Sequence, residues 1–120
     1  MAMYCGIDLH SNNNYVAIQD GRHEDVVCRR LRNDLGTVLE FLEPYREELE
    51  AIAVESTFNW YWLVDGLEAS GHTVHLVNTL AARQYKGLKY TDDKTDARWL
   101  AHMLRLGILP TGWIYPKQKR

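Results

Sequence analysis

The hydrophobic pattern of this chain changes its period near residue 33, and that change limits the folds available to it. Before it, short apolar runs rich in strand-forming residues cover positions 3–9, 15–19 and 25–31. Clusters of turn-forming residues separate these runs, and Asp20-Gly21 is a strong hairpin signal. The first quarter of the chain therefore predicts three strands in an antiparallel meander.

After residue 33 the apolar residues recur every three or four positions, which predicts a helix that runs to about Glu50. Asn33 or Asp34 is available as its N-cap, and Pro44 interrupts its second half because proline removes a backbone hydrogen bond. The pattern then predicts a buried strand over 51–54, a helix over 58–69 closed by Ser70-Gly71, a strand over 73–77 and helical sequence from residue 80.

Three antiparallel strands that lead into a strand–helix–strand–helix–strand segment predict an α/β fold. The sheet is expected to be mixed and to carry helices on its faces, because crossover helices must cover parallel strands. This is the element order of the ribonuclease H-like fold. We expect one such domain over residues 1–110, with residues 111–120 beginning a linker to a further domain outside this chain.

Composition places the 120-residue chain among ordinary soluble globular domains, with a net charge of -2 and a pI near 6.2. Cys5 and Cys28 have no metal-ligand spacing, so free thiols and a cytoplasmic location are expected. No apolar stretch is long enough to cross a membrane. The mild acidity argues against nucleic-acid binding by bulk positive charge, although cations bound to carboxylates would reverse the local sign.

Two acidic residues stand at the ends of predicted strands. Asp8 lies inside the first apolar run, where an unpaired charge would be costly to bury, and alternation places it on one face with Gly6. Glu55 ends the strand over 51–54 and shares a face with Ala53. If these strands are neighbours, the two acids lie side by side with small residues beneath them.

A second acidic pair, Asp93 and Asp96, opens the last predicted helix. The two residues are three positions apart and therefore lie on one helical face. They continue the apolar stripe of Ala97 and Leu100, and Gly107 is the expected C-cap. The face that packs on the sheet would thus carry two acids at its N-terminal end.

Four carboxylates of like charge repel one another unless they are protonated or bind a cation. Oxygen ligands favour hard divalent ions, so Mg²⁺ is the expected cofactor and Mn²⁺ would suit the same ligands. Two such ions could position a water and a leaving oxygen for phosphodiester cleavage. Taken one at a time, each acid is more often a turn cap or N-cap.

The segments GIDLH (6–10), VESTFNWYW (54–62), HTVHLVN (72–78) and TDDKTDARWLAHML (91–104) together resemble the N-terminal domain of the DEDD transposases. These are bacterial insertion-sequence recombinases with a RuvC-like core, related to the Piv invertases. The resemblance covers residues 3 to 110. This sequence departs from the usual pattern in the position of Lys94, and in carrying Phe58 and Asn59 where glycines are usual.

The resemblance implies that Asp8, Glu55, Asp93 and Asp96 form a catalytic tetrad that binds Mg²⁺ and processes DNA strands during transposition. It also implies a C-terminal domain that supplies a nucleophilic serine, so this chain would carry out part of the reaction. A guide RNA that bridges donor and target DNA is implicated in some members. A homo-oligomer is expected for the full-length protein.

Several basic and aromatic residues lie near the acids. Arg83, Lys86 and Lys89 precede the second acidic pair and suit phosphate contact, although a solvated helix face explains them equally well. Tyr61 follows Glu55 between two tryptophans and is a candidate for base stacking, with core packing as the alternative. His10 could approach Asp8, but a role in the turn is the preferred interpretation.

Two other functions compete with a Mg²⁺-dependent DNA-processing domain. Gly6-Ile7-Asp8 also resembles the first phosphate-binding strand of actin-like kinases, but the glycine-rich hairpin and second half of those proteins are missing here. The other is a non-catalytic nucleic-acid-binding or oligomerisation module of the same fold. A measurement of Mg²⁺ affinity separates the two functions, because only the catalytic domain is expected to bind Mg²⁺ and to lose that binding in Asp8→Asn.

Overall fold

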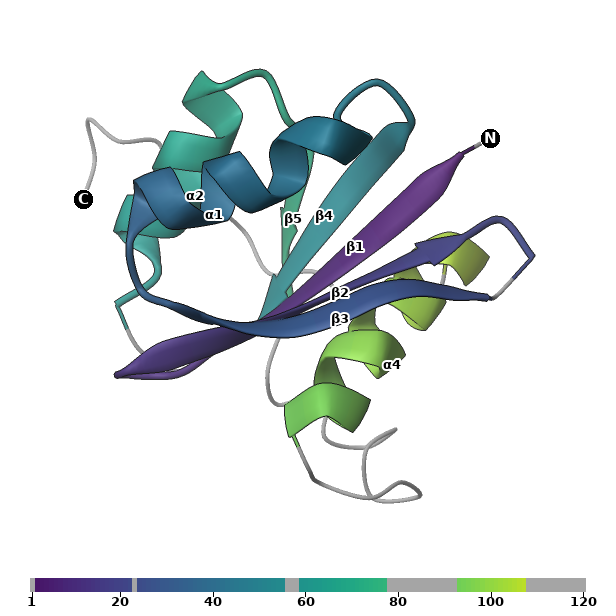
Figure 1. Ribbon diagram of the computed structural model, residues 1–120, viewed down its shortest axis with the longest axis horizontal. Coiled ribbons are helices and arrows are strands. Elements are labelled where there is room, and N and C mark those ends of the chain that lie inside the picture. The colour runs from purple at the N-terminus through teal and green to yellow at the C-terminus, as the bar shows by residue number, and fades with distance from the viewer. Residues whose placement is uncertain (1, 23, 56–58, 78–92, 108–120) are drawn as a thin grey trace.

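The computed structural model describes residues 2–22, 24–55, 59–77 and 93–107, the last range with side chains from residue 97 onward. Within these ranges one sheet has the strand order β3-β2-β1-β4-β5 (Figure 1). The strands are β1 (Met3–Leu9), β2 (Asn13–Asp20), β3 (Asp25–Arg32), β4 (Leu49–Glu55) and β5 (Val74–Leu76). Strands β1 to β3 pair antiparallel, whereas β4 and β5 run parallel to β1. The mixed sheet predicted from the sequence is confirmed.

Helices cover both faces of this sheet (Figure 1). On one face lie α1 (Leu35–Leu42) and α2 (Tyr61–Ala69), and on the other lies α4 (Asp93–Leu106). The larger core forms beneath α1 and α2, where Ile7 and Ile52 of the sheet are fully buried with Val38 and Leu67 of the helices. The fold class predicted from the element order is therefore confirmed.

The first helix is shorter than predicted. It ends at Leu42, and Pro44 occupies the first turn of a short 3₁₀ helix (Glu43–Tyr45) instead of the middle of an α-helix. The prediction of a helix to Glu50 was wrong because proline removes a backbone donor and its ring clashes with the preceding turn. The chain is thereby released early enough for β4 to begin at Leu49. Of the two predicted caps, Asp34 is the N-cap, and its side chain accepts a bond from the Thr37 backbone N–H.

The C-terminal ends of α2 and α4 match the sequence signals. Gly71 has φ of 94° after α2 and Gly107 has φ of 73° after α4, the left-handed conformation that closes helices and favours glycine. The predicted start of the second helix was wrong, because α2 begins at Tyr61 and Asn59 and Trp60 precede it. Residues 56–58, and the helix predicted from residue 80, lie outside the described residues.

Cys5 and Cys28 are free thiols, as predicted. Cys5 is completely buried, and the loss of solvation raises the pKa of its thiol far above the ordinary value, with a smaller contribution from Cys28. Among the helices that the structure describes, none combines the length and apolar character that a membrane span requires.

Candidate carboxylate site

Asp8 and Glu55 are register partners on adjacent parallel strands. Asp8 is the last residue of β1 that pairs with β4, and it lies directly beside Glu55, the last residue of β4. Each residue is only 5% exposed. Ionised carboxylates are seldom buried this deeply unless hydrogen bonds or a cation compensate the lost hydration. The structure thus brings together two of the four acids predicted from the sequence.

The two acids lie on the face of the sheet that α4 covers. Gly6 and Ala53, two positions before each acid, contact this helix: Ala53 packs with Leu100. A Cβ atom on Gly6 would overlap the carbonyl oxygen of Ala97 and lie 2.7 Å from the backbone nitrogen of Ala101. Because side chains alternate along a strand, Asp8 and Glu55 project from the same face.

Helix α4 runs antiparallel to β1, so its first residues lie toward the carboxyl end of β1, where Asp8 stands (Figure 1). Ala97 lies against Gly6, whereas Arg105, near the other end, is close enough to contribute to the lowered pKa of Asp20, the register partner of Met3. From Ala97 back to Asp93 is about 6 Å along the helix, and from Gly6 to Asp8 is about 6.6 Å along the strand. The backbone of Asp93 and Asp96 thus lies toward the end of β1 that bears Asp8. The structure does not describe the side chains of these two residues.

His10 contacts Asp8 directly. Its Nε2 lies 3.2 Å from Asp8 Oδ2, and its side chain is 41% exposed against 7% for that of the acid. The preferred sequence interpretation, a role in the turn, is confirmed, because the His10 backbone N–H donates to the Asn13 carbonyl at 2.9 Å. It was incomplete, because the side chain also approaches Asp8, which was the less favoured alternative. The spacing of two residues from Asp8 was the signal available in the sequence.

Two asparagines hold the turn that carries His10. Asn33 Nδ2 donates to the His10 carbonyl at 2.7 Å, and Asn14 Nδ2 donates to Asn33 Oδ1 at 2.9 Å. Asn14 is fully buried, so its amide is shielded from water and its bonds are difficult to replace. The end of β1, the start of β2 and the residues after β3 are thereby tied into one unit around Asp8.

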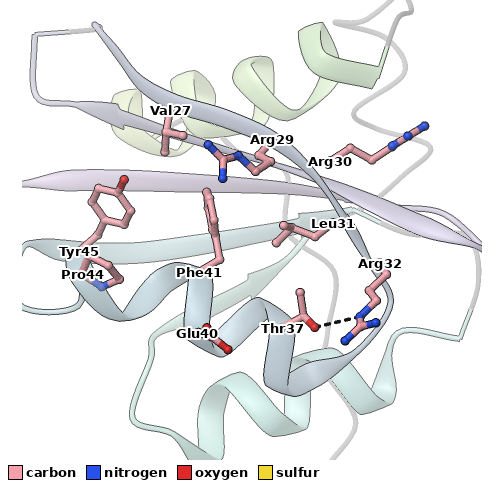
Figure 2. A pocket seen from close by; sticks show the side chains of 10 residues that line it. All are labelled: Val27, Arg29, Arg30, Leu31, Arg32, Thr37, Glu40, Phe41, Pro44 and Tyr45. Atoms are coloured by element: carbon pink, nitrogen blue, oxygen red, sulfur yellow. Dashed lines mark hydrogen bonds between the residues drawn. The ribbon is translucent and has the colours of Figure 1, made fainter.

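Tyr15 and Arg30 lie in one row with Asp8 and Glu55 across the sheet. Tyr15 is the register partner of Asp8 on β2, and Arg30 is the partner of Tyr15 on β3. Paired residues project from the same face, so one row runs from Arg30 through Tyr15 and Asp8 to Glu55. Figure 2 shows the Arg30 side chain turned away from α1, in agreement with this assignment. Sequence reasoning missed both residues, because only the strand register reveals the row.

The nucleic-acid-binding residues predicted from sequence are only partly described. Tyr61 is the first residue of α2 and is 42% exposed, with its ring centre 4.3 Å from that of Trp60. Trp60 and Trp62 pack against the core, so the tryptophans and not Tyr61 take the packing role. Arg83, Lys86 and Lys89 lie outside the described residues.

The chemistry of the acidic pair fits a hard divalent cation. Buried carboxylate oxygens at adjacent register positions are the ligands that Mg²⁺ prefers, and His10 beside Asp8 resembles the partners that orient metal-binding groups. Among the side chains that the structure describes, no group of three acidic, histidine or cysteine residues is complete enough to hold a metal ion. Any further metal ligands must therefore come from side chains that the structure does not describe. The first turn of α4, which carries Asp93 and Asp96, lies toward this end of the sheet.

A mixed sheet of this order, with a buried acid near the carboxyl end of each of two adjacent parallel strands, is the architecture of a ribonuclease H-like α/β domain. Among solved structures, RuvC of T. thermophilus in complex with a Holliday junction substrate resembles the chain with a TM-score of 0.65 and 14% identity, over 93% of this chain and 100% of that chain. A transcriptional regulator of the ROK family, a homologue of the E. coli MLC protein, is similar over 72% of this chain and 30% of that chain, with a TM-score of 0.47 and 16% identity.

A family model described as Transposase, that of the IS110-type DEDD transposases, matches residues 5–111. The chain therefore belongs to the DEDD transposase family, as its motifs predicted. No curated protein matches the sequence significantly.

Proposed function

We propose that this domain cleaves DNA strands during transposition and that Asp8, Glu55, Asp93 and Asp96 form its catalytic centre. The observation that carries the proposal is that Asp8 and Glu55 are buried as direct neighbours at the carboxyl ends of β1 and β4. The N-terminal end of α4 lies toward the same end of these strands. A structural role explains one buried carboxylate, but two adjacent ones repel each other unless a proton or cation compensates. Family membership supports DNA as the substrate.

These four acids would hold Mg²⁺, or Mn²⁺ in its place. When bound, the ion would lower the pKa of a water molecule and stabilise the charge that develops on the phosphate during cleavage. The carboxylates supply the negative charge that retains the ion. His10 orients Asp8 through the 3.2 Å contact, and Asn33 fixes the turn on which His10 stands.

The row beside the acids would hold the DNA backbone. Neighbouring strands are about 4.8 Å apart, so the Cα of Arg30 lies about 10 Å from that of Asp8. A phosphate placed between them is within reach of a long guanidinium side chain, and Tyr15 supplies a ring and a hydroxyl between the two. Tyr61, exposed on α2, could stack on a base. Arg83, Lys86 and Lys89 stay predicted DNA contacts, and a guide RNA and a homo-oligomer stay predicted partners.

The test is a nicking assay with branched and linear DNA in the presence of Mg²⁺. We expect Asp8→Asn and Glu55→Gln to lose more than about 100-fold in rate, because the loss of an outer partner of a metal ligand alone costs about 10- to 100-fold. His10→Ala should fall in that smaller range. Glu68→Gln, an exposed acid on the opposite helix layer, is the matched control and should be unchanged.

Nicking that survives Asp8→Asn in a folded protein would disprove the assignment of Asp8. A wild-type chain that binds DNA but shows neither nicking nor Mg²⁺ affinity would favour the non-catalytic module of the same fold.

A further inference from the structure

A groove opens on the other side of the sheet, between the edge strand β3 and α1. Its volume is about 720 Å³. Its lining residues are Val27, Arg29, Arg30, Leu31, Arg32, Thr37, Glu40, Phe41, Pro44 and Tyr45 (Figure 2). Because α1 and α4 cover opposite faces of the sheet, this groove is separate from the site of Asp8 and Glu55.

The lining of the groove is basic. Three arginines border it, of which Arg29 and Arg32 direct their side chains to it, against a single glutamate, Glu40, although the domain as a whole is slightly acidic. The Arg30 side chain turns away, whereas those of Arg29 and Arg32 lie on the α1 side (Figure 2). These two residues are exposed and stand about 10 Å apart along the strand.

Both guanidinium groups are oriented by residues of α1. The Arg29 Cζ atom lies 5.8 Å from the centre of the Phe41 ring, a cation–π contact. Arg32 Nε donates to Thr37 Oγ1 at 3.2 Å, which holds the guanidinium group beside the first turn of α1. Oriented arginines lose less conformational entropy on binding a phosphate than free ones.

Aromatic side chains line the same groove. The Phe41 and Tyr45 rings have centres 6.2 Å apart and are tilted by 49°. Both residues are half-buried, so part of each side chain is open to solvent. Guanidinium groups beside partly open aromatic rings suit a strand whose bases are unpaired, because the phosphates meet the arginines while a base stacks on a ring.

We propose that the β3–α1 groove binds a single-stranded nucleic acid, as a second site distinct from the carboxylate centre. Two other occupants would be disfavoured by charge. A second copy that pairs its β3 edge with this one would bring the arginines of two chains together. The last residues of this chain include Lys117, Lys119 and Arg120 and have the same sign as the groove.

The experiment measures binding of labelled single-stranded RNA and DNA of one mixed sequence by fluorescence anisotropy, without divalent metal. We expect Arg29→Gln/Arg32→Gln to bind both strands about tenfold more weakly. The slope of log affinity against log salt concentration should become shallower by about 0.7 for each phosphate that the variant no longer neutralises. Arg22→Gln, which removes an exposed arginine from the β2–β3 turn, is the matched control and should bind normally.

Further arms distinguish the alternatives. Mg²⁺ should still raise the melting temperature of Arg29→Gln/Arg32→Gln, because the groove is on the other face, so the groove can fail while the catalytic proposal stands. Equal affinity of the double variant and the control would overturn the proposal, as would equally tight binding of the matching duplex. Sedimentation that shows a wild-type dimer and a monomeric Arg29→Gln/Arg32→Gln variant, with strand binding intact, would assign the groove to a second copy.

Discussion

Gly6 decides how closely α4 approaches the sheet. A Cβ atom at this position would overlap the Ala97 carbonyl oxygen and come within 2.7 Å of both the Ala101 nitrogen and the Leu100 Cβ. Two of these three atoms belong to the helix backbone and cannot move aside as a flexible side chain can. The absence of a side chain at residue 6 thus sets the distance between β1 and the helix that begins with Asp93.

We expect Gly6→Ala to lower the free energy of unfolding by about 2 kcal/mol or more, because overpacking forces the backbone to shift. Urea denaturation followed by circular dichroism measures the loss. Gly21→Ala is the matched control, since the nearest atom to its added Cβ is the Ala2 carbonyl oxygen at 3.8 Å. Equal stability of the two variants would show that α4 does not pack against β1 as described.

Helix α1 is held at its first turn by Asp34. The Asp34 carboxylate accepts bonds from the Thr37 hydroxyl at 2.8 Å and from the Thr37 backbone N–H at 2.9 Å. The hydroxyl bond, followed by the backbone bond, lowers the pKa of this exposed carboxyl below its ordinary value. The same Thr37 hydroxyl accepts the Arg32 bond, so this cap also orients one wall of the groove.

A lowered pKa in the folded state means that the ionised carboxylate stabilises the fold. The stabilisation is present above the pKa of the unfolded chain and is lost as the pH falls through the lowered folded value. We expect wild type to exceed Asp34→Asn in melting temperature near neutral pH, with the difference vanishing in acid. Asparagine keeps the N-cap bond without titrating, so it isolates the charge. A difference that stays constant with pH would contradict this account.

The carboxylate centre proposed for Asp8, Glu55, Asp93 and Asp96 should couple the stability of the whole domain to divalent metal. We expect Mg²⁺ to raise the melting temperature, because an ion that binds only the folded state stabilises it, by about 2.7 kcal/mol at 100 times its dissociation constant. Without metal, Asp8→Asn and Glu55→Gln should be at least as stable as wild type, because they relieve repulsion, and they should lose the metal response. Differential scanning calorimetry across millimolar Mg²⁺ tests both effects.

Glu68→Gln serves again as the control and should respond to Mg²⁺ as the wild type does. An unchanged melting temperature of the wild type across the titration would contradict a preformed metal site in this chain.

The sequence by itself determined the elements and their order. Alternation in residues 3–31 and helical spacing afterwards are local properties, as are the glycines that close α2 and α4, so they could be predicted from the chain alone. The same patterns placed Asp8 and Glu55 at strand ends. The length of α1 was predicted wrongly because two signals, apolar spacing and Pro44, competed in one segment, and the proline prevailed.

Only the tertiary structure decided which residues meet. The pairing of Asp8 with Glu55 required β4 to lie beside β1, a contact between segments more than 40 residues apart. The row through Tyr15 and Arg30 depends on strand register, and a shift of one residue would turn Arg30 to the other face. The groove depends on the packing of α1 against an edge strand. Neighbour relations of this kind arise from burial of the whole chain and leave no local pattern in the sequence.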